Sequence, residues 1–282
     1  MIDGLRVPSN LDADNFLSGL QYKAQPGDIF IATYPKSGTT WMEVIVYSLL
    51  NNGKPFDADI GDYLMRTPHL EKVGGYTVST MVRPGSIKTH LPFDRISYHP
   101  QAKYICIIRN PKDVCASFYR FLERNPLSKY FECQFDEFFD DFLKGQVPLC
   151  DYFEYLHSLL PYKDRENVLI ISYEQMKRDI HCVIRKVAQF LNIELNAQDE
   201  LLDRVVATSS FEYMKKNFDK ARNDFYAHAT NDPKIPRVPL AFVQTGNIGG
   251  GKSYMSDEQK QQFDKVLAEK MRDMPEFEAL WQ

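Results

Sequence analysis

The chain has few cysteines, no excess of basic residues and no grouped histidines, and each absence argues against a class of protein. Its 5 cysteines are odd in number and include no C-x-x-C pair, so we expect reduced thiols rather than a disulfide framework or a zinc site. The net charge of −4 argues against a nucleic-acid partner, because nucleic-acid-binding proteins usually carry a basic excess. The 6 histidines are scattered along the chain, and we expect no metal.

The sequence also lacks any apolar run of the length that a membrane span needs, and Met1–Arg6 does not resemble the start of a secretory signal. We therefore expect a cytoplasmic protein with no membrane partner. There is no internal repeat and no low-complexity linker. With 282 residues, of which 44% are hydrophobic, the chain can bury one large core, and we expect a single domain over residues 1–282.

Short apolar runs rich in β-branched residues predict the strands of the fold, at 28–33, 85–89, 102–108 and 167–172. Helix-compatible segments are predicted at 112–124, 135–144, 151–160, 174–192, 197–206 and 257–273. This alternation is typical of an α/β fold with a central parallel sheet flanked by helices. The segments 66–85 and 222–253, which are rich in Pro and Gly, are expected to be mobile loops that wall the substrate site.

The stretch Tyr34–Trp41 joins the first predicted strand to a helix-compatible segment. Gly38 lets the backbone approach a ligand closely, and the amide groups that open the helix have no partner within it. Lys36 adds a cation, and Thr39 and Thr40 add hydroxyl groups. The stretch therefore predicts a P-loop-like cradle for a phosphate-like group. An ordinary capped helix after a strand explains this stretch, taken alone, equally well.

Polar side chains also follow two further predicted strands. Arg109 ends one strand, where its guanidinium could grip a phosphate, and Ser117 lies about two turns into the helix that follows. Lys88 and His90 end another strand, where they could form an acid/base pair beside a phosphate loop. Taken singly, a surface arginine and a structural histidine are the alternative interpretations.

The motifs YPKSGTTW, KTHLP and RNPKDVCASFYRF, in this order, resemble those of the cytosolic sulfotransferases. The likeness continues through 171–177 and 209–215 to the Gly-rich segment near 246–252, so it covers nearly the whole chain. The resemblance implies an α/β domain that binds 3′-phosphoadenosine 5′-phosphosulfate (PAPS). It also implies transfer of the sulfuryl group to a hydroxyl or amine of a small-molecule acceptor, with no metal.

The resemblance assigns the two phosphate-binding ends of the cofactor site. Arg109 and Ser117 would hold the 3′-phosphate, and Gln244, Thr245 and Gly246 stand where the family completes this grip. The 5′-phosphosulfate would be held by Lys36, Ser37, Gly38, Thr39, Thr40 and Trp41.

The resemblance also assigns the adenine contacts. Trp41 and Phe211 would stack on the base, while Tyr173 and Ser209 would contact it or its surroundings. Both Trp41 and Phe211 could equally be core aromatic residues.

For catalysis, the resemblance implies that His90 takes the proton from the acceptor. Lys88 would stabilise the sulfuryl oxygens and Lys36 would bond the bridging or leaving oxygen. Ser117 completes the set of residues assigned to catalysis.

Two segments depart from the family pattern. Where relatives carry Arg-Lys-Gly, this chain has Gln244-Thr245-Gly246, so two cations are missing from the 3′-phosphate grip. A charge-assisted hydrogen bond contributes about 1.5–3 kcal/mol, so we expect altered cofactor affinity. The stretch Lys252–Gln261 keeps only one of the four fixed positions of the family's dimer-forming motif, so the oligomeric state is not carried over.

The acceptor pocket is the least readable part of the sequence. In the stretch Arg66–Glu71, His69 replaces an aromatic residue of relatives that act on simple phenols, so it is either a polar pocket residue or an exposed loop histidine. We expect Phe118, Tyr119 and Phe121 to help line the pocket, together with residues before Ala24. A small phenol or aromatic amine is the expected acceptor.

Two competing functions remain open at this point. The stretch Gly246–Ser253 fits the Walker A expression, which would suggest an ATP-dependent kinase, although such a loop needs a preceding strand. The altered pair Gln244 and Thr245 would also fit a nucleotide-binding protein that has lost activity on the same fold.

Overall fold

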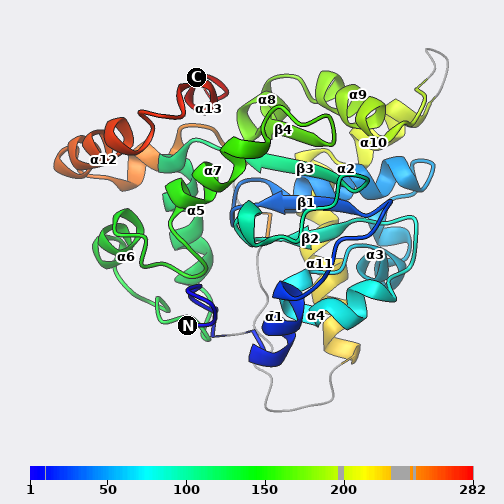
Figure 1. Cartoon of the computed structure of the whole chain (residues 1–282), viewed down its shortest axis with the longest axis horizontal. Coiled ribbons are helices and arrows are strands. Elements are labelled where there is room, and N and C mark those ends of the chain that lie inside the picture. The colour runs from blue at the N-terminus through cyan, green and yellow to red at the C-terminus, as the bar shows by residue number, and fades with distance from the viewer. Residues whose placement is uncertain (10, 196–199, 230–241, 244–245, 282) are drawn as a thin grey trace.

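The computed structural model describes residues 1–9, 11–195, 200–229, 242–243 and 246–281. Its sheet contains β1 (Ile29–Thr33), β2 (Ile87–Thr89), β3 (Lys103–Ile108) and β4 (Val168–Ser172). The strands lie in the order β2-β1-β3-β4, and each neighbouring pair is parallel. The predicted α/β class and each predicted strand are therefore confirmed. Figure 1 shows the strands side by side, with α1 and α4 beyond the β2 edge.

The helices that surround the sheet can be followed in Figure 1. They are α1 (Ala13–Leu20), α2 (Thr39–Leu50), α3 (Ile60–Arg66), α4 (Leu70–Ser79), α5 (Pro111–Leu122), α6 (Phe135–Leu143), α7 (Tyr152–Leu159), α8 (Tyr173–Arg178), α9 (Ile180–Leu191), α10 (Leu201–Thr208), α11 (Phe211–Ala229), α12 (Asp257–Lys270) and α13 (Pro275–Ala279). Among the described helices, none has the length and apolar character that crossing a bilayer requires.

Alternate residues of the strands pack into different hydrophobic clusters, because successive strand side chains point to opposite faces. Ile31, Ile105 and Ile107 join a cluster built with α2, α9 and α10. Phe30 and Tyr104 join the other cluster, which includes residues of α5, α6, α7 and α12. Both faces of the sheet are thus covered, which is why the strands read as continuous apolar runs.

The expected loop at 66–85 is wrong, because α4 lies within it. The glycines there serve packing: a Cβ on Gly75 would lie 2.7 Å from the carbonyl oxygen of Ser18 in α1. Gly74, with φ of 79°, kinks α4 at the same contact. The second expected loop, 222–253, begins inside α11.

The prediction of a single helix over 174–192 is also wrong, because the helix is interrupted at Asp179. Asp179 has φ −150° and ψ 87°, which ends α8, and its carboxylate accepts a hydrogen bond of 2.9 Å from the amide of Cys182 at the start of α9. An aspartate at this position can cap a new helix, so the chain forms two helices in succession.

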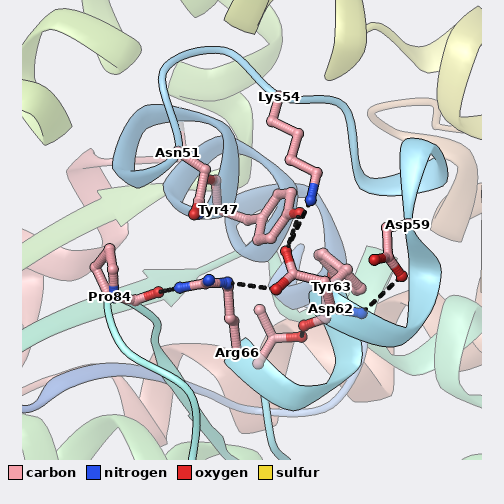
Figure 2. Close-up of polar contacts among 9 residues, drawn as sticks. Tyr47, Asn51, Lys54, Asp59, Asp62, Tyr63, Arg66 and Pro84 are labelled. Atoms are coloured by element: carbon pink, nitrogen blue, oxygen red, sulfur yellow. Dashed lines mark hydrogen bonds and ion pairs between the residues drawn. The ribbon is translucent and has the colours of Figure 1, made fainter.

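Asp62 is the centre of a polar network that fixes α3 against α2 (Figure 2). Its carboxylate accepts hydrogen bonds from Tyr47 at 2.9 Å, from Lys54 at 3.0 Å and from Arg66 at 2.8 Å. Arg66 also donates to the carbonyl of Pro84 at 2.9 Å. The network therefore joins the helix that follows the P-loop to α3 and to the segment before β2.

We expect Asp62→Asn to lower the free energy of unfolding by about 1–3 kcal/mol, because hydrogen bonds from Arg66, Lys54 and Tyr47 favour the ionised carboxylate. Burial alone would raise the pKa of Asp62, but these donors outweigh it and lower the pKa to about 2. A depressed pKa stabilises the fold above the unfolded-state pKa of about 4 and loses that effect as the pH falls toward 2.

Urea unfolding at pH 7 and at pH 3.5 measures this effect, and the difference between wild type and variant should shrink at the lower pH. Asp59→Asn is the matched control, because Asp59 only caps α3 and asparagine caps equally well. Equal stability of wild type and Asp62→Asn at pH 7 would contradict the role of the network.

Candidate active site

The predicted P-loop connects β1 to α2 through a backbone that includes two residues of positive φ. Lys36 has φ 67° and Gly38 has φ 117°, and α2 begins at Thr39. A Cβ on Gly38 would lie 3.0 Å from Cδ2 of Tyr173, at a φ that favours glycine. The turn therefore needs glycine, and it presents the start of α2 to the adjoining cavity.

A cavity of about 690 Å³ opens in front of this loop. It gathers residues from the predicted cofactor, catalytic and acceptor sets into one continuous space. These are Lys36, Gly38, Thr39, Thr40, Trp41, His69, Lys88, His90, Arg109, Ser117, Phe118, Phe121, Tyr173, Ser209, Phe211 and Gly246.

Ser37 is the described residue of the predicted cofactor and catalytic sets that does not line the cavity. Its side chain is fully buried, and its hydroxyl has no hydrogen-bond partner among the described atoms. Gln244 and Thr245 lie outside the described residues.

Positive charge accumulates around the P-loop. Burial lowers the pKa of Lys36, and the charges of Lys88 and Arg109 lower it further, to about 7. The Lys36 ammonium lies 4.5 Å from the centroid of the Phe121 ring. Because these cations disfavour one another when no anion is present, this end of the cavity is suited to a multiply charged anion.

Arg109 connects the P-loop to the Gly-rich segment. One of its terminal nitrogens donates to the carbonyl of Lys36 at 3.1 Å, and the other donates to the carbonyl of Asn247 at 3.0 Å. The centre of its guanidinium group lies 4.0 Å from the centroid of the Tyr173 ring. The predicted neighbours Arg109 and Tyr173 are therefore in contact.

The two aromatic residues predicted to stack on adenine are close to the same cation. The ammonium of Lys177 lies 6.0 Å from the Trp41 ring centroid and 5.9 Å from that of Phe211. Lys177 lines the cavity, and the sequence analysis did not select it. Ser209 also lines this region, but its hydroxyl donates to the carbonyl of Val205 at 2.7 Å.

His90 is oriented so that one ring nitrogen faces the backbone. Its Nδ1 lies 2.7 Å from the carbonyl oxygen of Thr33, and because a carbonyl can only accept, Nδ1 carries the proton. Nε2 therefore keeps its lone pair. Burial lowers the pKa of His90, and the charges of His69 and Lys88 lower it further, to about 3, so the imidazole is neutral at physiological pH. A neutral imidazole with an available Nε2 can act as a general base.

Two buried carboxylates contact Lys88 and His90, which are predicted to be catalytic, and the sequence analysis missed both. Glu43 lies 3.3 Å from the ammonium of Lys88. Glu71 accepts a hydrogen bond from the backbone amide of His90, and its other oxygen lies 3.4 Å from Nε2 of His69. An acidic residue within the apolar face of α2 is the signal that could have identified Glu43.

The acceptor end of the cavity differs in one residue from the prediction. Tyr119 does not line it, because its hydroxyl donates to the carbonyl of Cys133 at 2.9 Å and its ring packs on Phe135 at 5.2 Å. Successive residues on a helix point in different directions, so Phe118 and Phe121 face the cavity while Tyr119 faces α6. Pro8 and Leu11 line the cavity, as expected for residues before Ala24.

The Gly-rich segment does not have the geometry of a Walker A loop. Its turn, η4 (Gly250–Tyr254), follows no strand in the described part of the chain after β4. The amides of Gly249 and Gly251 each donate to the carboxylate of Asp113 at 2.7 Å, so these donors are not presented to a phosphate. The kinase interpretation is therefore not supported.

Comparison with known proteins agrees with this geometry. The family model described as "Sulfotransferase domain" matches residues 26–275. The chain belongs to the sulfotransferase family. This sulfotransferase is 35% identical to sulfotransferase 2A6 of Mus musculus, over 88% of this chain and 85% of the relative. It is 30% identical to the 3-alpha-hydroxysteroid sulfotransferase of Cavia porcellus, over 97% of this chain and 94% of the relative.

A solved structure shares the fold of this sulfotransferase over nearly its full length. The crystal structure of mouse sulfotransferase SULT7A1 complexed with PAP superimposes with a TM-score of 0.76 at 26% identity, covering 99% of this chain and 97% of the other. Among the described residues, no group of three His, Cys, Asp or Glu side chains is arranged to hold a metal ion. That the reaction needs no metal stays a prediction.

We expect Gly251→Ala to destabilise the Gly-rich segment. A Cβ on Gly251 would lie 2.3 Å from the carbonyl oxygen of Lys112, and it would disturb the hydrogen bonds to Asp113. Overpacking of this kind costs about 1–3 kcal/mol in the free energy of unfolding, which urea titration measures. Gly250→Ala is the control and should change stability by less than about 0.5 kcal/mol, because nothing lies within 4 Å of its Cβ. Equal effects of the two substitutions would contradict this account.

Proposed function

We propose that this sulfotransferase transfers the sulfuryl group of PAPS to a hydroxyl or amine of a small acceptor, with His90 as general base. The observation that supports this most is one cavity that joins a cationic P-loop to a neutral imidazole whose Nε2 is available. The likeness to a relative crystallised with PAP, the desulfated form of the cofactor, supports the choice of nucleotide.

In this proposal the nucleotide's 5′-phosphosulfate lies at Lys36 and the start of α2. Arg109 and Ser117 bind the 3′-phosphate, and the adenine lies between Trp41 and Phe211. Lys177 adds a cation on the adenine side, where it is close to both rings. These positions of the nucleotide follow the family pattern. The cluster of Lys36, Lys88 and Arg109 is the physical reason to place phosphate groups beside it.

The reaction proposed is an in-line displacement at sulfur. The acceptor oxygen or nitrogen gives its proton to Nε2 of His90, and its lone pair forms the new bond to sulfur. The bond between sulfur and the phosphate oxygen breaks, and its electron pair stays with the phosphate of PAP. Lys36 neutralises the charge on the leaving oxygen, while Lys88, positioned by Glu43, stabilises the sulfuryl oxygens.

The alternative, a nucleotide-binding protein without activity, is less well supported. It was motivated by Gln244 and Thr245, which lie outside the described residues. His90, Lys36 and Lys88 all line the same cavity. We therefore favour an active enzyme that acts on a small phenol or aromatic amine. A single domain over residues 1–282 and a cytoplasmic location stay predictions.

His90→Ala should abolish turnover and retain PAP binding. A well-placed general base contributes about 10²–10⁴-fold to rate, whereas Nε2 of His90 contributes to proton transfer rather than to holding the nucleotide. The test measures transfer from PAPS to a panel of phenols and amines without added metal, with PAP binding followed by calorimetry. His157→Ala is the control, since His157 is exposed on α7. Unchanged turnover in His90→Ala would remove His90 from the mechanism.

PAP binding should weaken as the pH rises above 7, because Lys36 loses its proton there. Because the pKa of Lys36 is about 7 without an anion beside it, an anion that binds at higher pH must restore the ammonium form. Affinity should then fall roughly tenfold per pH unit above 7, up to the pKa of Lys36 in the complex. In Lys36→Arg this decrease should be absent, because arginine stays charged. Calorimetry at pH 7, 8 and 9 measures both proteins, and parallel profiles would contradict the assignment.

A further inference from the structure

We propose that Arg120 binds the 3′-phosphate of the nucleotide, next to Arg109 and Ser117. In this way it compensates for Gln244 and Thr245, which stand where relatives carry Arg and Lys. This inference rests on the proposed function and adds one nucleotide-binding residue to it.

Arg120 lies on the same side of α5 as Ser117. Residues three apart on a helix are neighbours on its surface, and Ser117 and Arg120 both line the cavity. Tyr119 lies between them in the sequence but does not line the cavity, because its hydroxyl donates to the carbonyl of Cys133. The helix therefore contributes a hydroxyl and a guanidinium group to the same stretch of cavity wall.

The Arg120 side chain also lies against the Gly-rich segment. The centre of its guanidinium group is 5.5 Å from the centroid of the Tyr254 ring in η4. Tyr254 in turn packs on Phe135, with ring centroids 5.7 Å apart. Arg109 contacts the same segment at the carbonyl of Asn247. Two arginines, one after β3 and one on α5, thus contact the segment with which the family completes its phosphate grip.

The charge of Arg120 acts on the P-loop as well. Besides burial and the charges of Lys88 and Arg109, the charge of Arg120 lowers the pKa of Lys36. A guanidinium group keeps its proton at physiological pH, so Arg120 adds a permanent positive charge to the site. Cations placed in this way repel one another until an anion binds, and a phosphate group would reduce that repulsion.

The other cations of the cavity have different surroundings. Apart from Arg109, the described lysines and arginines that line it are Lys36, Lys72, Lys88, Arg120, Lys177 and Arg222. Lys36 and Lys88 are assigned to the sulfuryl transfer, and Lys177 lies near the rings predicted to stack on adenine. Lys72 belongs to α4, and Arg222 belongs to α11 and packs on the ring of Phe242 at 4.0 Å. Arg120 is the cation of this set that shares a helix with Ser117.

The test compares the binding of PAP with that of adenosine 5′-phosphate, which has the same base and 5′-phosphate but no 3′-phosphate. Calorimetry gives the two dissociation constants, and their ratio measures how strongly the protein prefers the nucleotide with the 3′-phosphate. In Arg120→Gln this preference for PAP should fall about tenfold or more, because hydrogen bonds to a charged group are lost.

Arg124→Gln is the matched control. Arg124 follows α5, its side chain is 65% exposed and pairs with Glu123, and it does not line the cavity. This variant removes the same charge four residues away, so the preference for PAP should stay within about threefold of the wild type. Arg120→Lys separates charge from packing on Tyr254. It keeps a cation that can bind phosphate, so it should retain a larger part of the preference than Arg120→Gln.

An unchanged preference for PAP in Arg120→Gln would overturn the role of Arg120. Equal losses in Arg120→Gln and Arg120→Lys would overturn it too, because they would show an effect of packing rather than of charge. A wild type that binds PAP no more tightly than adenosine 5′-phosphate has no 3′-phosphate site, which also overturns the inference.

Sulfuryl transfer from PAPS to the acceptor panel, measured on the same wild-type protein, tests the proposed function separately. A wild type that prefers PAP through Arg120 but transfers sulfuryl to no acceptor would support the binding role and contradict the proposed function. The two failures are therefore distinguishable.

Discussion

The site is organised by the mutual repulsion of cations that the fold places around one loop. Lys36, Lys88 and Arg109 come from the P-loop and from the ends of β2 and β3, and together with burial they hold the pKa of Lys36 near 7. Such an arrangement costs folding free energy until an anion arrives. The parallel sheet provides it, because the carboxyl ends of neighbouring parallel strands meet at one edge. The fold thus loses some stability to repulsion between these cations, and a nucleotide with several phosphates would offset that repulsion.

Buried acidic side chains near the site hold the framework in place. Glu43 pairs with Lys88, Glu71 holds the backbone of His90 together with the ring of His69, and Asp113 accepts the amides of the Gly-rich segment. Each carboxylate has at least one oxygen engaged by its own partner. Because these carboxylates are engaged by different partners, they lie close to the predicted anion site without entering it.

Much of the fold and of the candidate site could be predicted because the signals are local. The strands, the turn at Gly38 and the strand-end residues Arg109 and His90 each depend on a few consecutive residues. The predictions that failed, and the residues that were missed, depend on contacts between residues that are distant in the sequence. The glycines of α4 look like loop residues until Ser18 of α1 is seen against them. Glu71 has no local signal, because its role appears only where β2 brings His90 to it.

Arg109 connects two segments that lie far apart in the sequence, the P-loop and the Gly-rich segment. Its guanidinium donates to main-chain carbonyls on both sides, one at Lys36 near the start of the chain and one at Asn247 near its end. Its Nε has no hydrogen-bond partner among the described residues, so the guanidinium keeps a donor for a phosphate while both carbonyl contacts stay in place. The same side chain therefore fixes the Gly-rich segment to the P-loop and presents a cation to the cavity.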